Sequence, residues 1–229
     1  MLRAHADLIL IVAGVFLLLP TLAQAFYFPP PATSGFNEAA MRALLAYYGD
    51  HFAMVFAMRL VTLAGTGTIL ALLTGPGRPT VGEAIGLALR LLPSLFLVDV
   101  IGQFIVMAGL VLLILPGLYI LARAAVASPV MMAESTGNPL HALGRSFDLS
   151  RGLGWQIFGL IAIIFVVLWI ATSAFATVLG VIGSLLMTEG AARILRLALA
   201  ALSTTLLMLG STLISAGLYR QLVTLKSGM

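Results

Sequence analysis

The sequence predicts an all-α integral membrane protein, a polytopic helical bundle of about six transmembrane helices plus two interfacial amphipathic helices. The 229 residues are 61% hydrophobic and only 9% charged, whereas soluble domains average roughly 45–50% and 25%. Apolar runs of about 20 residues, the length of a transmembrane helix, recur along the whole chain. These runs do not alternate polar and apolar residues as a membrane β-barrel requires. Together they indicate a single integral membrane domain over residues 1–229 and exclude a soluble enzyme domain.

The first three predicted spans cover residues 8–26, 52–74 and 94–115. Residues that disfavour helix follow each of them: three prolines after the first, Gly-Pro-Gly after the second, and Pro116-Gly117 after the third. The start of the chain also has the basic residue, the apolar stretch and the Ala-Gln-Ala site of a cleaved signal peptide. We expect a retained span, with the cleaved signal as the alternative.

The last three predicted spans cover residues 118–133, 155–179 and 194–219. The segment 118–133 is short for a bilayer and carries Arg123 and Pro129. We therefore expect it to tilt, kink or form a re-entrant segment.

Two connecting segments, residues 80–92 and 140–149, have apolar side chains on one helical face and charged residues elsewhere. Both are predicted to lie as helices in the headgroup plane. The predicted apolar faces are Val81, Ala84, Ile85, Ala88 and Leu92 in the first, and Leu140, Leu143 and Phe147 in the second. A Gly-x-Pro sequence precedes each segment. This shared order has two explanations, a duplicated structural unit within the chain or coincidence.

Basic residues in the loops predict the orientation of the chain. With six spans and an inner N-terminus, seven basic residues lie inside (Arg3, Arg78, Arg90, Arg145, Arg151, Arg220, Lys226) and three outside (Arg42, Arg193, Arg196). This bias predicts a bacterial inner membrane protein with both termini in the cytoplasm. A re-entrant fourth segment would instead place the C-terminus outside. Because the basic residues do not cluster among aromatic ones, no nucleic-acid partner is expected.

Charged residues within the apolar spans are candidate functional residues, because an intramembrane charge is costly unless it is paired or hydrated. Arg59 and Arg123 are expected at a similar depth, where two cations would suit a phosphate group. Asp99 and Glu134 are expected about 10–15 Å nearer the inner side. The favoured interpretation is nevertheless structural: each charge snorkels or bonds backbone carbonyls freed by the prolines. In particular, Arg123 is predicted to point into the bundle and hold the third, fourth and a neighbouring span together.

Motifs for catalysis, cofactors or metals do not occur in the sequence. His5, His51 and His141 fall on loops of opposite sides, so no catalytic residue, cofactor site or metal site is predicted. Gly65-Thr66-Gly67 within the second span is predicted to be a packing element. Ser203, Ser211 and Ser215 in the last span are predicted to serve helix packing, with a polar translocation path as the less favoured alternative.

One stretch, residues 115–155, resembles a known membrane family. The residues that carry this resemblance are Leu115, Pro116, Gly117, Tyr119, Arg123, Ser128, Pro129, Glu134, Ala142, Leu143, Arg145, Ser146, Leu149, Gly152 and Trp155. They resemble the signature of the glycerophosphoryl diester phosphodiesterase membrane-domain family and of free-standing YciC-like six-span bacterial membrane proteins. In fused relatives the phosphodiesterase activity belongs to a separate soluble barrel of about 250 residues. Since this chain lacks such a barrel, the resemblance implies an inner-membrane helical protein and not that enzyme.

Two classes of function follow from these observations. The first is a non-catalytic inner-membrane protein that organises or partners envelope or lipid-handling machinery, with membrane lipids, a second copy of the chain or an envelope protein as partner. The alternative is a transporter or a lipid-headgroup-binding carrier with an intramembrane arginine site. A closed, dry bundle favours the first, and a cavity that reaches the arginines favours the second. The candidate structural or anionic-lipid contacts are Arg59, Asp99, Arg123, Glu134, Arg145, Ser146 and Arg151, with Arg145 or Arg151 expected at lipid phosphates or paired with Glu134 or Asp148.

Overall fold

The computed structural model describes residues 2–31, 37–75, 77, 79–112 and 114–227. In these ranges the regular structure is helical throughout, and no strand occurs among them. The predicted all-α class is therefore confirmed. Five helices are long and apolar enough to cross a membrane, namely Asp7–Tyr27, Phe52–Thr74, Val81–Ile105, Gly154–Leu186 and Glu189–Ser227.

The first span consists of α1 (Leu2–Ala13), η1 (Gly14–Leu18) and α2 (Leu19–Tyr27). The middle segment is a π-helix, in which the N–H of Leu19 bonds the carbonyl of Gly14. This wider turn precedes Pro20, which has no N–H to donate and whose ring would crowd the carbonyl four residues earlier. Within the same turn, Leu17 is fully buried in a cluster with Ile69. The first span is thus packed into the bundle.

A helix that we did not predict, α3 (Glu38–Asp50), follows the first span. The side chain of Asn37 caps it, accepting a hydrogen bond of 2.7 Å from the N–H of Ala40. The second predicted span is then confirmed with its boundaries, as α4 (Phe52–Thr74).

The predicted interfacial helix 80–92 is not a separate element, and this prediction was wrong. It forms the first part of α5 (Val81–Leu112), which continues through Pro93. Its apolar face packs on protein instead of lying on the membrane, since Ala84 and Ala88 are completely buried. The start of α5 is capped reciprocally: the N–H of Thr80 donates to Oε2 of Glu83 at 2.7 Å, and the N–H of Glu83 donates to Oγ1 of Thr80 at 3.4 Å.

The expected fourth span is replaced by two short helices, α6 (Ile114–Ala124) and α7 (Ala127–Ala133). About six spans were expected, and five long ones are found in the part of the chain that the structure describes, while the segment expected to tilt, kink or be re-entrant is the one divided into two helices. The helix break predicted at Pro116-Gly117 was wrong, because both residues lie within α6. Pro116 then occupies the first turn of α6, where the missing N–H costs little.

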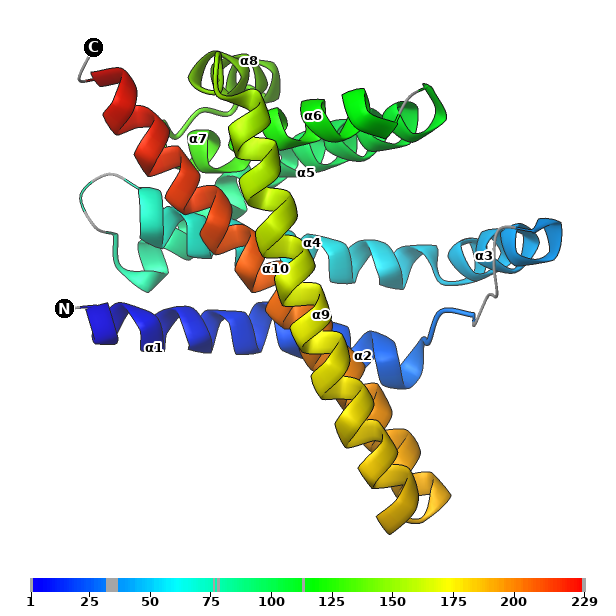
Figure 1. The fold of residues 1–229 in the computed structure, drawn as a ribbon. Coiled ribbons are helices and arrows are strands. Elements are labelled where there is room, and N and C mark those ends of the chain that lie inside the picture. Colours follow the sequence, from blue (N-terminus) through cyan, green and yellow to red (C-terminus); the bar gives the residue numbers. More distant parts are fainter. Residues whose placement is uncertain (1, 32–36, 76, 78, 113, 228–229) are drawn as a thin grey trace.

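The rest of the chain forms α8 (Pro139–Leu149), α9 (Gly154–Leu186) and α10 (Glu189–Ser227). The second predicted amphipathic helix is confirmed as α8, whereas α9 and α10 are longer than the spans predicted for them. In Figure 1 the α9–α10 hairpin crosses diagonally over the later part of the first span and over α4, and α10 contacts η1, α2 and α4. The main core cluster draws buried side chains from α4 to α10, including Leu70, Val126 and Met131.

Candidate binding groove

A polar groove lies among α4, α5, α6, α7 and α10. Its volume is ≈370 Å³. The groove is lined by eight charged or hydroxyl side chains, which are Arg59, Thr62, Thr66, Asp99, Ser128, Ser211, Thr212 and Ser215, together with Leu63, Leu70, Leu121, Ala125 and Met208. A second cavity of ≈350 Å³ shares Thr66, Asp99 and Ser128 with the groove and continues along α5 to Gln103.

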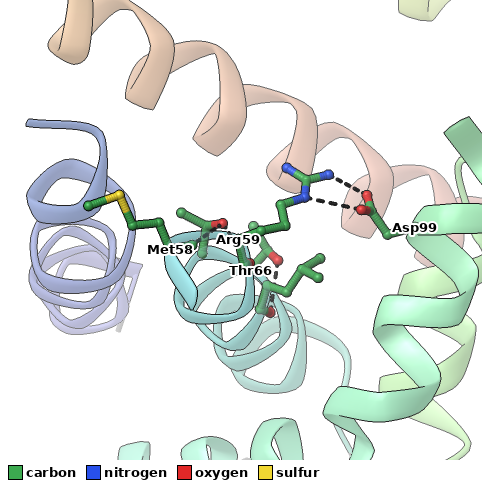
Figure 2. Close-up of polar contacts among 6 residues, drawn as sticks. Met58, Arg59, Thr66 and Asp99 are labelled. Atoms are coloured by element: carbon green, nitrogen blue, oxygen red, sulfur yellow. Dashed lines mark hydrogen bonds and ion pairs between the residues drawn. The ribbon is translucent and has the colours of Figure 1, made fainter. Parts of the chain in front are cut away.

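An ion pair between Arg59 and Asp99 joins α4 to α5 at this groove (Figure 2). Nε of Arg59 donates to Oδ2 of Asp99 at 3.1 Å, and Nη2 donates to Oδ1 of the same carboxylate. The side chains of Arg59 and Asp99 are 36% and 21% exposed, so the ion pair is partly buried. This two-point geometry is the one in which a guanidinium binds a carboxylate most specifically.

Asp99 was expected about 10–15 Å nearer the inner side of the membrane than Arg59, and that prediction was wrong. Because α5 already begins at Val81, Asp99 lies 18 residues, or ~27 Å, beyond the α4–α5 connection. Arg59 lies 15 residues before Thr74, the end of α4, or ~22 Å from the same connection. In an antiparallel pair of helices these two positions differ by only about one helical turn, so the side chains meet.

Five of the six hydroxyl groups that line the groove donate their proton to their own helix. Thr62 donates to the carbonyl of Arg59 at 2.8 Å, and Thr66 donates to that of Leu63 at 3.0 Å. On α10, Ser211 and Thr212 both donate to the carbonyl of Met208, and Ser215 donates to that of Thr212. A hydroxyl has one proton and two lone pairs. These side chains therefore offer the groove mainly hydrogen-bond acceptors.

Close helix packing on the other faces of α4 fixes the position of the groove. A Cβ atom at Gly65 would lie 2.3 Å from Cβ of Phe16, and one at Gly67 would lie 2.8 Å from Cδ1 of Leu95. The predicted packing role of these glycines is confirmed. By contrast, the packing interpretation of Ser211 and Ser215 was too narrow, because both line the groove.

Thr62 and Thr66 are groove residues that the sequence analysis missed. They follow Arg59 at intervals of three and seven residues, which places all three on one face of α4. That spacing within an apolar span was a usable signal.

Arg123 does not share a site with Arg59 and instead connects α6 to α8. Nε of Arg123 donates to Oγ of Ser150 at 3.0 Å, and Nη2 donates to the carbonyl of Phe147 at 2.6 Å. In return, Oγ of Ser146 donates to the carbonyl of Arg123 at 2.6 Å. The guanidinium also lies 4.8 Å from the centre of the Phe147 ring. The predicted inward orientation is right, but Arg123 holds the short helix α8 and not a neighbouring span, because the C-terminal carbonyls of α8 lack helical partners.

The other basic residues of this region also have structural contacts. Nε of Arg145 lies 3.2 Å from Oε1 of Glu134, which confirms the pairing predicted for these two residues. Arg151 is exposed after the end of α8. The predicted apolar face of α8 was partly wrong, because Leu140 is 69% exposed whereas Ser146 is completely buried.

Two basic residues of α10 bond carbonyls at the ends of other helices. Arg220 donates to the carbonyl of Leu73 at the end of α4, and Lys226 donates to that of Asp148 at the end of α8. Cations stabilise helix C-termini, where carbonyls lack partners and the helix dipole is negative. Arg220 and Lys226, which were used only to predict the membrane orientation, thus also hold α10 against the ends of α4 and α8.

No protein-family model, no curated protein and no solved structure matches this chain. The resemblance of residues 115–155 to the phosphodiesterase membrane domain therefore stays a prediction. What the structure provides is a multi-pass helical bundle with a polar, arginine-containing groove.

Proposed function

We propose that this protein is an inner-membrane carrier that binds a phosphate-bearing polar group, from a lipid headgroup or a small solute, in the groove at Arg59. The observation that carries the proposal is that Arg59 lines the groove and bonds Asp99 with only part of its donor capacity. A guanidinium has five N–H donors, and two of them bond Asp99 among the described residues. The remaining donors suit the tetrahedral oxygens of a phosphate.

The size and lining of the groove support a ligand site. Its volume of ≈370 Å³ lies in the range of small-molecule pockets, about 300–1,000 Å³. Its eight polar side chains come from α4, α5, α7 and α10, so a ligand in the groove would meet ionic and hydrogen-bonding partners on several helices. This favours the carrier over the non-catalytic organising module, for which we expected a closed bundle.

The proposed orientation places both ends of the chain in the cytoplasm, with the pair α6–α7 crossing the membrane as a broken sixth span beside the five long ones. The excess of basic residues in the predicted inner loops supports it.

Lipid titration followed by native mass spectrometry tests the proposal. The purified protein is titrated with a phospholipid and with a diacylglycerol of the same acyl chains, which lacks the phosphate. We expect the phospholipid to be retained and the diacylglycerol to be lost, and we expect Arg59→Gln to weaken retention by about tenfold or more. Arg42→Gln is the matched control, because Arg42 pairs with Glu38 on α3 and is 77% exposed. Equal retention by Arg59→Gln, Arg42→Gln and the parent would overturn the proposal.

A further inference from the structure

We infer that the ligand of the groove is zwitterionic: a phosphate ester that also carries a free ammonium group. This inference rests on the proposed function and specifies its ligand class. The phosphate would bind Arg59, and the ammonium would bind Asp99 and the hydroxyl oxygens around it.

The ion pair itself is the first reason. The carboxylate of Asp99 already accepts hydrogen bonds from Nε and Nη2 of Arg59, so a phosphate on the remaining donors of the guanidinium would lie close to that carboxylate. A purely anionic ligand would therefore leave a second negative charge beside it without a cation. Two negative groups that share one cation repel each other, which disfavours such a ligand. A ligand that brings its own cation replaces one ion pair with two.

The hydroxyl groups are the second reason. Thr62, Thr66, Ser211, Thr212 and Ser215 all donate to carbonyls of their own helices. They face the groove with lone pairs, and Asp99 adds carboxylate oxygens. Such a lining needs donors from the ligand. A primary ammonium has three N–H donors and no acceptor, so it complements these oxygens.

The arrangement of the charges is the third reason. Arg59 on α4 and Asp99 on α5 both line the same groove, side by side (Figure 2). The phosphate and ammonium groups of an ethanolamine phosphate are separated by two carbons, so one small headgroup can reach both charges. The hydroxyls of Ser211, Thr212 and Ser215 on α10 line the same groove.

Competition between matched ligands tests the inference. The parent protein in phosphatidylcholine nanodiscs is titrated with phosphatidylethanolamine or phosphatidylglycerol of identical acyl chains. In a separate arm it is titrated with soluble O-phosphoethanolamine or glycerol phosphate, which distinguishes a lipid headgroup from a free solute. If the ligand is a lipid, we expect phosphatidylethanolamine to bind about tenfold more tightly than phosphatidylglycerol. If the ligand is a free solute, we expect O-phosphoethanolamine to bind about tenfold more tightly than glycerol phosphate.

The Asp99→Asn variant makes the test specific. It removes the negative charge but keeps the shape, so the preference for the ammonium should disappear while binding of the phosphate persists. Arg42→Gln should keep the preference of the parent. Equal binding of both ligands that still depends on Arg59 would overturn the zwitterion inference and leave the proposed function standing. Binding of neither ligand in either arm would overturn both.

Discussion

Replacement of Arg123 removes the side-chain contacts that this residue makes from α6 to α8, and the cost in stability follows from those contacts. The guanidinium makes two hydrogen bonds, to Ser150 at 3.0 Å and to the carbonyl of Phe147 at 2.6 Å. A hydrogen bond from a charged donor contributes about 1.5–3 kcal/mol, and a cation–π contact adds roughly 0.5–1 kcal/mol. Because leucine restores some apolar packing, we expect Arg123→Leu to lower the free energy of unfolding by about 3 kcal/mol.

Thermal unfolding of the detergent-solubilised protein measures this effect. One kcal/mol shifts the melting temperature of a chain of this size by about 2–4 °C, so we expect a decrease of about 6–12 °C. Intrinsic tryptophan fluorescence is a suitable signal, since the ring centres of Trp155 and Tyr119 lie 5.0 Å apart next to this connection. Arg123→Lys should cost nearly as much, because an ammonium cannot bond both acceptors in the same fork.

The control for this prediction is Arg151→Leu, which removes an exposed arginine just after the same helix. We expect it to melt within about 2 °C of the parent, as most exposed substitutions do. If Arg123→Leu also melted like the parent, the structural role of Arg123 would be wrong. Loss of a bound anionic lipid without a change in melting would assign Arg123 to ligand binding instead.

Two further predictions concern packing and topology. Gly65→Ala should destabilise the protein by about 1–3 kcal/mol, since the added Cβ would lie 2.3 Å from Cβ of Phe16, whereas at Gly86 nothing lies within 4 Å. Gly86→Ala should therefore melt at or above the parent, and equal losses in the two variants would contradict the packing of α4 on the first span. Reporters fused after the last residue and within residues 29–37 should show a cytoplasmic C-terminus and a periplasmic loop, and a periplasmic C-terminus would refute the proposed orientation.

The helices that hydrophobicity alone defines were predictable from the sequence. The boundaries of α4 follow from an apolar run that ends at Gly75. The helix α3 was missed because hydropathy does not mark it, although Asn37 is a recognisable N-cap. The continuity of α5 through Pro93 was missed as well. A proline within a helix only disfavours its continuation, and tertiary packing of the preceding turns on α4 decides the outcome.

The groove was predictable in part. Arg59 and Asp99 were identified as candidates because charges are rare in apolar spans. Their pairing was not, because the depth assigned to Asp99 depended on where α5 begins. The contribution of α10 was predicted only as the less favoured alternative, since back-bonded serines serve packing and polar cavities equally well, and only the packing of α10 on α4 distinguishes the two uses.

Cysteine accessibility tests the central claim, a polar groove that water reaches inside the bundle. The chain has no cysteine of its own, so a single introduced thiol gives an unambiguous signal. We expect Ser211→Cys, within the groove, to react readily with a charged thiosulfonate reagent in intact membranes, because only a hydrated thiol ionises. Val178→Cys is the control, since its side chain is 57% exposed on the apolar surface of α9, where lipid would cover it. Reaction at position 211 and not at 178 is the predicted result, and equal inertness of both thiols would contradict the groove.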